Sequence, residues 1–149
     1  MAQGQSPQDR LGVFKELSDV PEGRRFYQFE SAYEGRDPWA DYRATVELSD
    51  RMGEEWARFS RRWKEHMAVQ GRHHALAQPD DVEAWSEELL SRFSRDRAYQ
   101  HWNVIEGFYE WLKCHTEHRH SYNPFHMAAS EPGSSARKIW NRKMEKSNA

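Results

Sequence analysis

The sequence predicts an all-α protein, with an irregular aromatic arm before its helical body and a basic helix after it. Apolar residues recur at spacings of three and four in several segments. This spacing is the period of one face of an α-helix. Gly and Pro residues fall between these segments, where they favour turns. No segment gives a convincing strand pattern.

Residues 1–45 form the expected arm. Residues 1–6 are polar, and we expect them to be disordered. Pro and Gly residues interrupt the rest, so we expect short helical turns. The aromatic content is too high for a free linker, so the arm should pack on the body. Residues 1–50 hold 6 Lys and Arg against 10 Asp and Glu, a balance of −4, which makes the arm a poor surface for polyanions.

The body is expected to span residues 46–130, and its first long helix residues 48–70. The apolar stripe has spacings of 4, 4, 3, 4 and 4, and Gly71 is a natural stop. The stripe consists of Leu48, Met52, Trp56, Phe59, Trp63 and Met67. The outward side and its flanks carry the basic residues Arg58, Arg61, Arg62 and Lys64. A solvated basic face and a binding surface both fit this pattern.

Two further helices complete the centre of the body. Residues 81–93 predict a helix capped by Asp80 or Asp81, and its acidic exposed side indicates a structural role. Residues 94–118 predict the longest helix, with Ser94 as the N-cap. Its inner stripe is Ala98, Trp102, Ile105, Tyr109 and Leu112. Its leading outer side carries Arg95, Arg97, Gln100 and Asn103, side-chain types that hold phosphates and read base edges. An ordinary helix surface fits these four residues as well.

The last part of the chain is punctuated by Asn123-Pro124, which ends the long helical region. Residues 125–129 predict one more helical turn. Residues 131–149 predict a hinge and a tail helix over residues 136–146. The apolar residues of that helix are Ile139, Trp140 and Met144. Its basic residues are Arg137, Lys138, Arg142, Lys143 and Lys146, against one acid, a balance of +4.

Composition limits the classes of function. No apolar run reaches the roughly 18 residues of a membrane span, and no signal-peptide pattern opens the chain. A single cysteine excludes an internal disulfide framework, so we expect a cytoplasmic protein. The formal net charge is only −2. Any attraction to nucleic acid must therefore depend on local patches.

The segment from Cys114 to His120 contains the only cluster typical of metal binding. Cys114 and His118 are four residues apart, but no second pair of ligands completes a tetrahedral zinc site. Surface histidines at a helix end are the alternative, and we expect no metal and no cofactor. No catalytic motif is present. We expect Cys114 to be partly buried, and His101 to be a half-buried packing residue.

Four stretches of residues 48–124 carry a family resemblance. They are the Trp/Phe-striped first helix, PDDVEAWSEELL, SRFSRDRAYQHWNVIEGFYEWL, and Asn123-Pro124. Together they resemble the N-terminal core-binding (SAM-like) domain of tyrosine recombinases of the phage-integrase type. The stretches YEGRDPWADY and NPFHMA are similar to haloarchaeal members. Arg97 departs from the family pattern, which has a small hydroxyl residue at that position.

The resemblance implies a compact bundle of four to five helices that forms one half of a clamp around double-stranded DNA. It also implies that the first helix and the start of the long helix face the DNA. The family's catalytic domain would follow this domain, and the chain ends at Ala149. We therefore expect no strand cleavage by this chain alone and no enzyme activity. A full-length integrase or another protein is an expected partner.

A protein-interaction domain is the alternative from another class. In that case Tyr99, Trp111 and the apolar residues of the tail helix would contact a protein partner, and the basic face would be incidental. The position of four arginines distinguishes the two hypotheses. One contiguous face would favour nucleic acid, and scatter would favour protein interaction. These arginines are Arg61, Arg62, Arg95 and Arg97.

Overall fold

The computed structural model describes residues 6–147, and within that range it contains helices and no strand. The all-α prediction is therefore confirmed. The 3₁₀ helices are η1 (Pro7–Arg10), η2 (Leu17–Asp19), η3 (Glu22–Arg24) and η4 (Phe26–Phe29). The α-helices are α1 (Glu30–Tyr33), α2 (Pro38–Ala44), α3 (Asp50–Gln70), α4 (Pro79–Arg92), α5 (Arg95–Cys114), α6 (Pro124–Ser130) and α7 (Ser135–Ser147).

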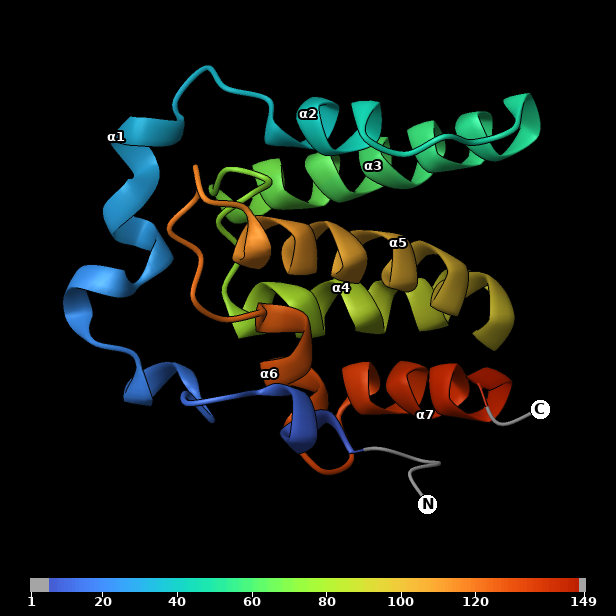
Figure 1. Cartoon of the computed structure of the whole chain (residues 1–149). Helices are drawn as coiled ribbons and strands as arrows, with labels where there is room; N and C mark the ends of the chain where they lie inside the picture. The colour runs from blue at the N-terminus through green and yellow to red at the C-terminus, as the bar shows by residue number, and fades with distance from the viewer. Residues whose placement is uncertain (1–5, 148–149) are drawn as a thin grey trace.

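The body is a bundle in which α3 and α4 pack against the central helix α5 (Figure 1). Helix α7 packs against α4, α5 and α6, so it belongs to this bundle. Its residues Ala136, Ile139 and Trp140 are buried. The sequence-based alternative needed Ile139 and Trp140 on the surface, and that part of it is wrong. The apolar face of α7 is already covered by the body.

Local signals set the helix starts, as the sequence predicted for Ser94. The Ser94 side chain accepts a hydrogen bond from the Arg97 amide at 3.1 Å. Ser49 caps α3 in the same way through the Met52 amide, so α3 begins two residues later than predicted. Helix α4 is capped by Gln78, and neither Asp80 nor Asp81 takes that position. A serine hydroxyl satisfies an otherwise unpaired amide of the first turn, which fixes where each helix begins.

Gly71 ends α3 in the left-handed conformation, with φ of 77°. Replacing Gly71 with Ala is expected to lower the free energy of unfolding by about 1 kcal/mol, because a Cβ disfavours this backbone conformation. Space is not the reason, since an added Cβ would meet no atom within 4 Å. Chemical denaturation of Gly71→Ala beside Gly23→Ala tests this, because Gly23 has no positive φ. Equal losses in the two variants would contradict the prediction.

The arm runs along one end of the bundle, from η1 beside α6 to α2 beside α5 (Figure 1). Its side chains Phe26, Phe29, Tyr33 and Trp39 are buried. Phe26 stacks on Tyr122 with ring centroids 4.1 Å apart. The arm therefore contributes to the core. The predicted disorder of residues 1–6 falls mostly on residues 1–5, which lie outside the described range, and Ser6 is the N-cap of η1.

The predicted end of the long helix at His118 is wrong, because α5 ends at Cys114. Beyond it the chain turns back under the arm, where His118 Nδ1 lies 2.5 Å from the Tyr33 hydroxyl. His120 Nε2 lies 2.7 Å from the Ala75 carbonyl. Both histidines are buried, so they are not surface residues at a helix end. Cys114 is exposed, which contradicts the expected partial burial.

Candidate nucleic-acid interface

Arg62 stands at the centre of the basic face of α3. Its Nη1 lies 2.8 Å from Nε2 of His101 on α5, and its guanidinium lies 5.1 Å from the centroid of the Phe93 ring. Arg97 on α5 is placed similarly, with its guanidinium 5.2 Å from the Phe59 ring centroid. An arginine stacked on an aromatic ring keeps its edge donors free for a planar anion. Both guanidiniums are thus held in place. Arg62 keeps donors beyond the one that contacts His101, whereas both Nη atoms of Arg97 bind Glu55 and one also binds Gln100.

His101 holds Arg62 as a neutral acceptor. Its Nδ1 lies 2.8 Å from the Arg97 carbonyl. A carbonyl can only accept, so Nδ1 carries the hydrogen and Nε2 accepts from Arg62. Burial, and then the nearby Arg62 and Arg97, lower the pKa of His101 to about 4. The sequence suggested a half-buried packing residue, but His101 is fully buried and orients the central arginine.

Five arginines from three helices form what we call the arginine cluster. Burial lowers the pKa of Arg62, and the neighbouring arginine charges lower it further. The cluster consists of Arg58, Arg61, Arg62, Arg92 and Arg97. Two carboxylates contact it, Glu55 and Glu88. The five arginines and these two carboxylates sum to +3, and Glu65, which lines the groove beside Arg62, brings the balance to +2. Like charges held this close repel one another, so an added anion would relieve an existing cost.

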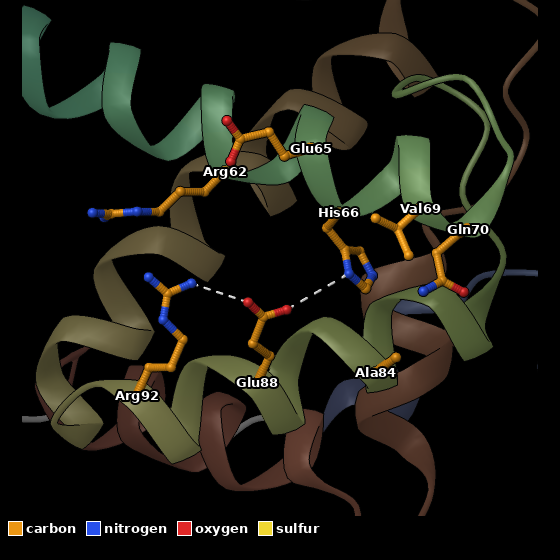
Figure 2. Close-up of a pocket in the computed structure, with 8 residues that line it drawn as sticks. All are labelled: Arg62, Glu65, His66, Val69, Gln70, Ala84, Glu88 and Arg92. Atoms are coloured by element: carbon orange, nitrogen blue, oxygen red, sulfur yellow. Dashed lines mark hydrogen bonds and ion pairs between the residues drawn. The ribbon is translucent and has the colours of Figure 1, made fainter.

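A groove of about 310 Å³ lies between α3 and α4 beside the cluster (Figure 2). Arg62 and Arg92 point to the same end of it, one from each helix. Glu88 accepts a hydrogen bond from Arg92 at 3.0 Å and lies 4.0 Å from His66 Nδ1. The groove therefore presents the guanidiniums of Arg62 and Arg92 at one end. Arg92 is paired there with the Glu88 carboxylate.

The remaining predicted basic residues do not join this face. Lys64 contacts Asp37 at 3.1 Å, and Arg95 contacts Glu145 at 2.7 Å. The tail residues Arg142 and Lys143 contact Asp96 and Glu106, each at 2.6 Å. Arg137 donates to the Ala129 carbonyl, and Lys138 is exposed. The balance of +4 counted along the tail is therefore not a free basic surface, because acids of α5 and α7 pair with three of its five basic residues, Arg142, Lys143 and Lys146.

Only some of the four arginines whose positions distinguish nucleic-acid binding from protein interaction lie on one face. Arg61, Arg62 and Arg97 lie within one cluster, whereas Arg95 turns toward Glu145 on α7. Gln100 belongs with the cluster, because its amide oxygen accepts from Arg97 Nη1 at 2.8 Å. Sequence reasoning missed Arg92, since α4 looked acidic on its exposed side. The only signal for it was its place in the last turn of a helix that meets α5 through a short break.

A second hollow lies between the first halves of α3 and α5. It holds about 390 Å³, and each of the two helices contributes both apolar and polar residues to its lining. The lining includes Met52, Trp56, Phe59, Tyr99 and Asn103. Met52 is 41% exposed, so apolar surface is accessible here. Trp111, by contrast, packs against Tyr42 of α2, with ring centroids 5.5 Å apart.

Within residues 6–147, no group of three or more His, Cys, Asp or Glu residues is placed to hold a metal ion. In the same range no helix has the length and apolar character to cross a membrane. Fold and site together define a small all-α protein with a cluster of five arginines beside a groove. Comparison of the chain with protein-family models, curated proteins and solved structures finds no match in any of the three.

Proposed function

We propose that this chain binds double-stranded DNA through phosphate contacts made by the arginine cluster. The observation that carries the proposal is Arg62, which is stacked on Phe93, held by neutral His101 and surrounded by four other arginines. Guanidiniums are suited to phosphate because their donors match its oxygens in pairs. Contacts of this kind position a protein on a duplex without reading its sequence.

The resemblance to the integrase core-binding domain supports the same face. It implies that the first long helix and the start of the next face DNA, and these segments are α3 and the N-terminal turns of α5. On this proposal the chain is a cytoplasmic binding module that does not cleave DNA itself. A full-length integrase is then a natural protein partner, because it would bind the same kind of site.

Fluorescence anisotropy of a labelled 30-base-pair duplex tests the proposal. Arg61→Glu and Arg62→Gln are expected to weaken binding at least tenfold at low salt. Each lost phosphate contact should also reduce the slope of log K against log salt by about 0.9. Arg61 is the cleaner site, because it is exposed and has no hydrogen bond or ion pair with residues 6–147.

The matched control is Arg24→Glu, which makes the same charge change on the exposed arm. It should bind the duplex nearly as well as the parent protein. Equal weakening by Arg24→Glu and Arg61→Glu would mean that only overall charge matters, and the proposed face would be wrong. Absence of binding by the folded parent protein at low salt would remove the DNA proposal itself.

The hollow lined by Met52 and Tyr99 favours protein interaction as the second candidate function. It is an exposed apolar surface next to the cluster, and the polar residues that also line it are Arg51, Glu55, Gln100 and Asn103. Apolar hollows with a polar rim are typical of protein contact sites. If the protein fails to bind DNA, this hollow is the surface to test next. Ile139 and Trp140 are not, since both are buried.

A further inference from the structure

Glu55 lies inside the arginine cluster. Its carboxylate contacts the guanidiniums of both Arg58 and Arg97. Arg97 Nη2 also donates to Glu55 Oε2 at 3.2 Å, so both Nη atoms of Arg97 bind the carboxylate. The Glu55 side chain is only 22% exposed, because these arginines cover it. The hydrogen bond from Arg97, together with both arginine charges, holds the pKa of Glu55 below its usual range despite partial burial.

The environment of this carboxylate resembles the one that arginines give to a phosphate. Two guanidiniums from different helices converge on its oxygens, and one of them is stacked on Phe59. Carboxylates and phosphates are the two anions that arginine binds through paired hydrogen bonds. The pair with Arg97 joins α3 to α5, whereas the neighbouring Glu54 has no ion pair among residues 6–147.

We infer that the Glu55 carboxylate occupies, in the free protein, a position taken by a DNA phosphate in the complex. The inference rests on the proposed function. Binding would then replace the contacts of Glu55 with Arg58 and Arg97 by contacts of a phosphodiester with the same two arginines. Glu55 thereby lowers the affinity for DNA and keeps the free cluster from binding other anions tightly.

The consequence is a gain of affinity when the Glu55 charge is removed. Ion pairs that stay partly open to solvent are weak individually, so loss of the competing carboxylate is expected to tighten duplex binding about three- to tenfold. Removal of any negative charge near the arginine cluster is expected to raise the affinity for the duplex by a smaller amount, and salt screens this smaller effect. Glu54→Gln provides that baseline, because Glu54 is exposed, lies one residue away on the same helix and is not bound by an arginine.

The experiment measures anisotropy of the 30-base-pair duplex with the full chain as parent protein, Glu55→Gln and Glu54→Gln, at two salt concentrations. A thermal melt of each protein shows whether it is folded. The expected result is a gain for Glu55→Gln that exceeds the gain for Glu54→Gln at least threefold and persists at the higher salt. Arg58→Gln/Arg97→Gln in the Glu55→Gln background should abolish it.

Two results would overturn the inference, and they separate it from the proposed function. Equal gains for the two variants, with the parent protein still binding DNA, would show that Glu55 does not compete for a phosphate position. The DNA proposal would then stand on the Arg61 and Arg62 results. Absence of binding by all three folded proteins would overturn both proposals together.

Discussion

Lowering the pH from 7 to 5 is expected to remove about 6 kcal/mol from the free energy of unfolding, about 2 kcal/mol for each of three histidines, of which His101 and His120 are buried and His74 is largely buried. Burial is the largest cause in each case. It lowers the pKa of His74 to about 3 and those of His101 and His120 to about 4. A loss of this size is comparable to the total stability of many domains. We therefore expect acid unfolding well above pH 4.

The direction follows from which state binds protons. In the unfolded chain these histidines titrate near 6.5, whereas in the folded chain they stay neutral down to about 4. The unfolded state thus takes up protons first as the pH falls. The contribution of these histidines to the free energy of unfolding is complete above pH 6.5 and is lost progressively as the pH falls from 6.5 to 4. Buried Glu106 has a lowered pKa, so its contribution is lost only at a lower pH.

Urea denaturation at pH 7, 6 and 5 measures this loss. His120→Gln should be less stable at pH 7 but should lose about 2 kcal/mol less between pH 7 and 5, because glutamine does not titrate. Its amide can still donate to the Ala75 carbonyl that His120 contacts. A pH dependence identical to that of the parent protein would show that His120 is not one of the groups responsible.

The long helices of the body could be predicted because their signals are local. The apolar stripe of α3, its stop at Gly71 and the cap at Ser94 all lie within a few residues of the boundary they set. The end of α5 could not be predicted in this way. The turn after Cys114 places His118 against Tyr33, a partner 85 residues away. Tertiary contacts of this range leave no mark in the local sequence.

The candidate site was predictable only as far as one helix determines it. The period of α3 predicts Arg58 and Arg61 on its outward side and Arg62 on a flank, and the charges of Arg58 and Arg61 both act on Arg62. Arg92 comes from another helix, and the role of His101 depends on contacts with two arginines at once. These features depend on how α4 and α5 pack against α3. A count of charges along the chain gives no information about that packing.

The contacts of the basic residues of α7 could not be predicted for the same reason, since they depend on the packing of another helix. The local count there is five basic residues against one acid, yet Arg142 pairs with Asp96 and Lys143 with Glu106 of α5. A local excess of charge predicts a free basic surface only where the neighbouring helix is not acidic. In α7 the positive charges contact acids of α5, so they contribute to folding before they can contribute to binding.

Glu106 is the centre of that contact and the site of the second large predicted effect. Its side chain is 4% exposed, and its two oxygens lie 2.7 Å from His126 Nε2 and 2.6 Å from Lys143 Nζ. Burial alone would raise the pKa of Glu106, but the bond from His126 and the charge of Lys143 outweigh it and keep the pKa below its usual range. Glu106 is therefore buried as a carboxylate.

Lys143→Met is expected to lower the free energy of unfolding by about 3 to 5 kcal/mol, because it leaves this buried carboxylate with the His126 bond alone. Lys138→Met is the control on the same helix. Lys138 is exposed and has no ion pair with residues 6–147, so it should change stability by about 0.5 kcal/mol or less. Urea denaturation of both variants at pH 7 measures the difference.

A double-mutant cycle shows whether the effect belongs to the pair. Glu106→Gln/Lys143→Met leaves no buried charge unpaired, so it should cost less than the sum of the two single variants by at least 1 kcal/mol. Additive losses would mean that Lys143 acts through its packing over Trp140, whose ring centroid is 5.5 Å from Nζ. A coupled loss would establish that α7 is held to α5 by charge, and that its basic residues serve the fold.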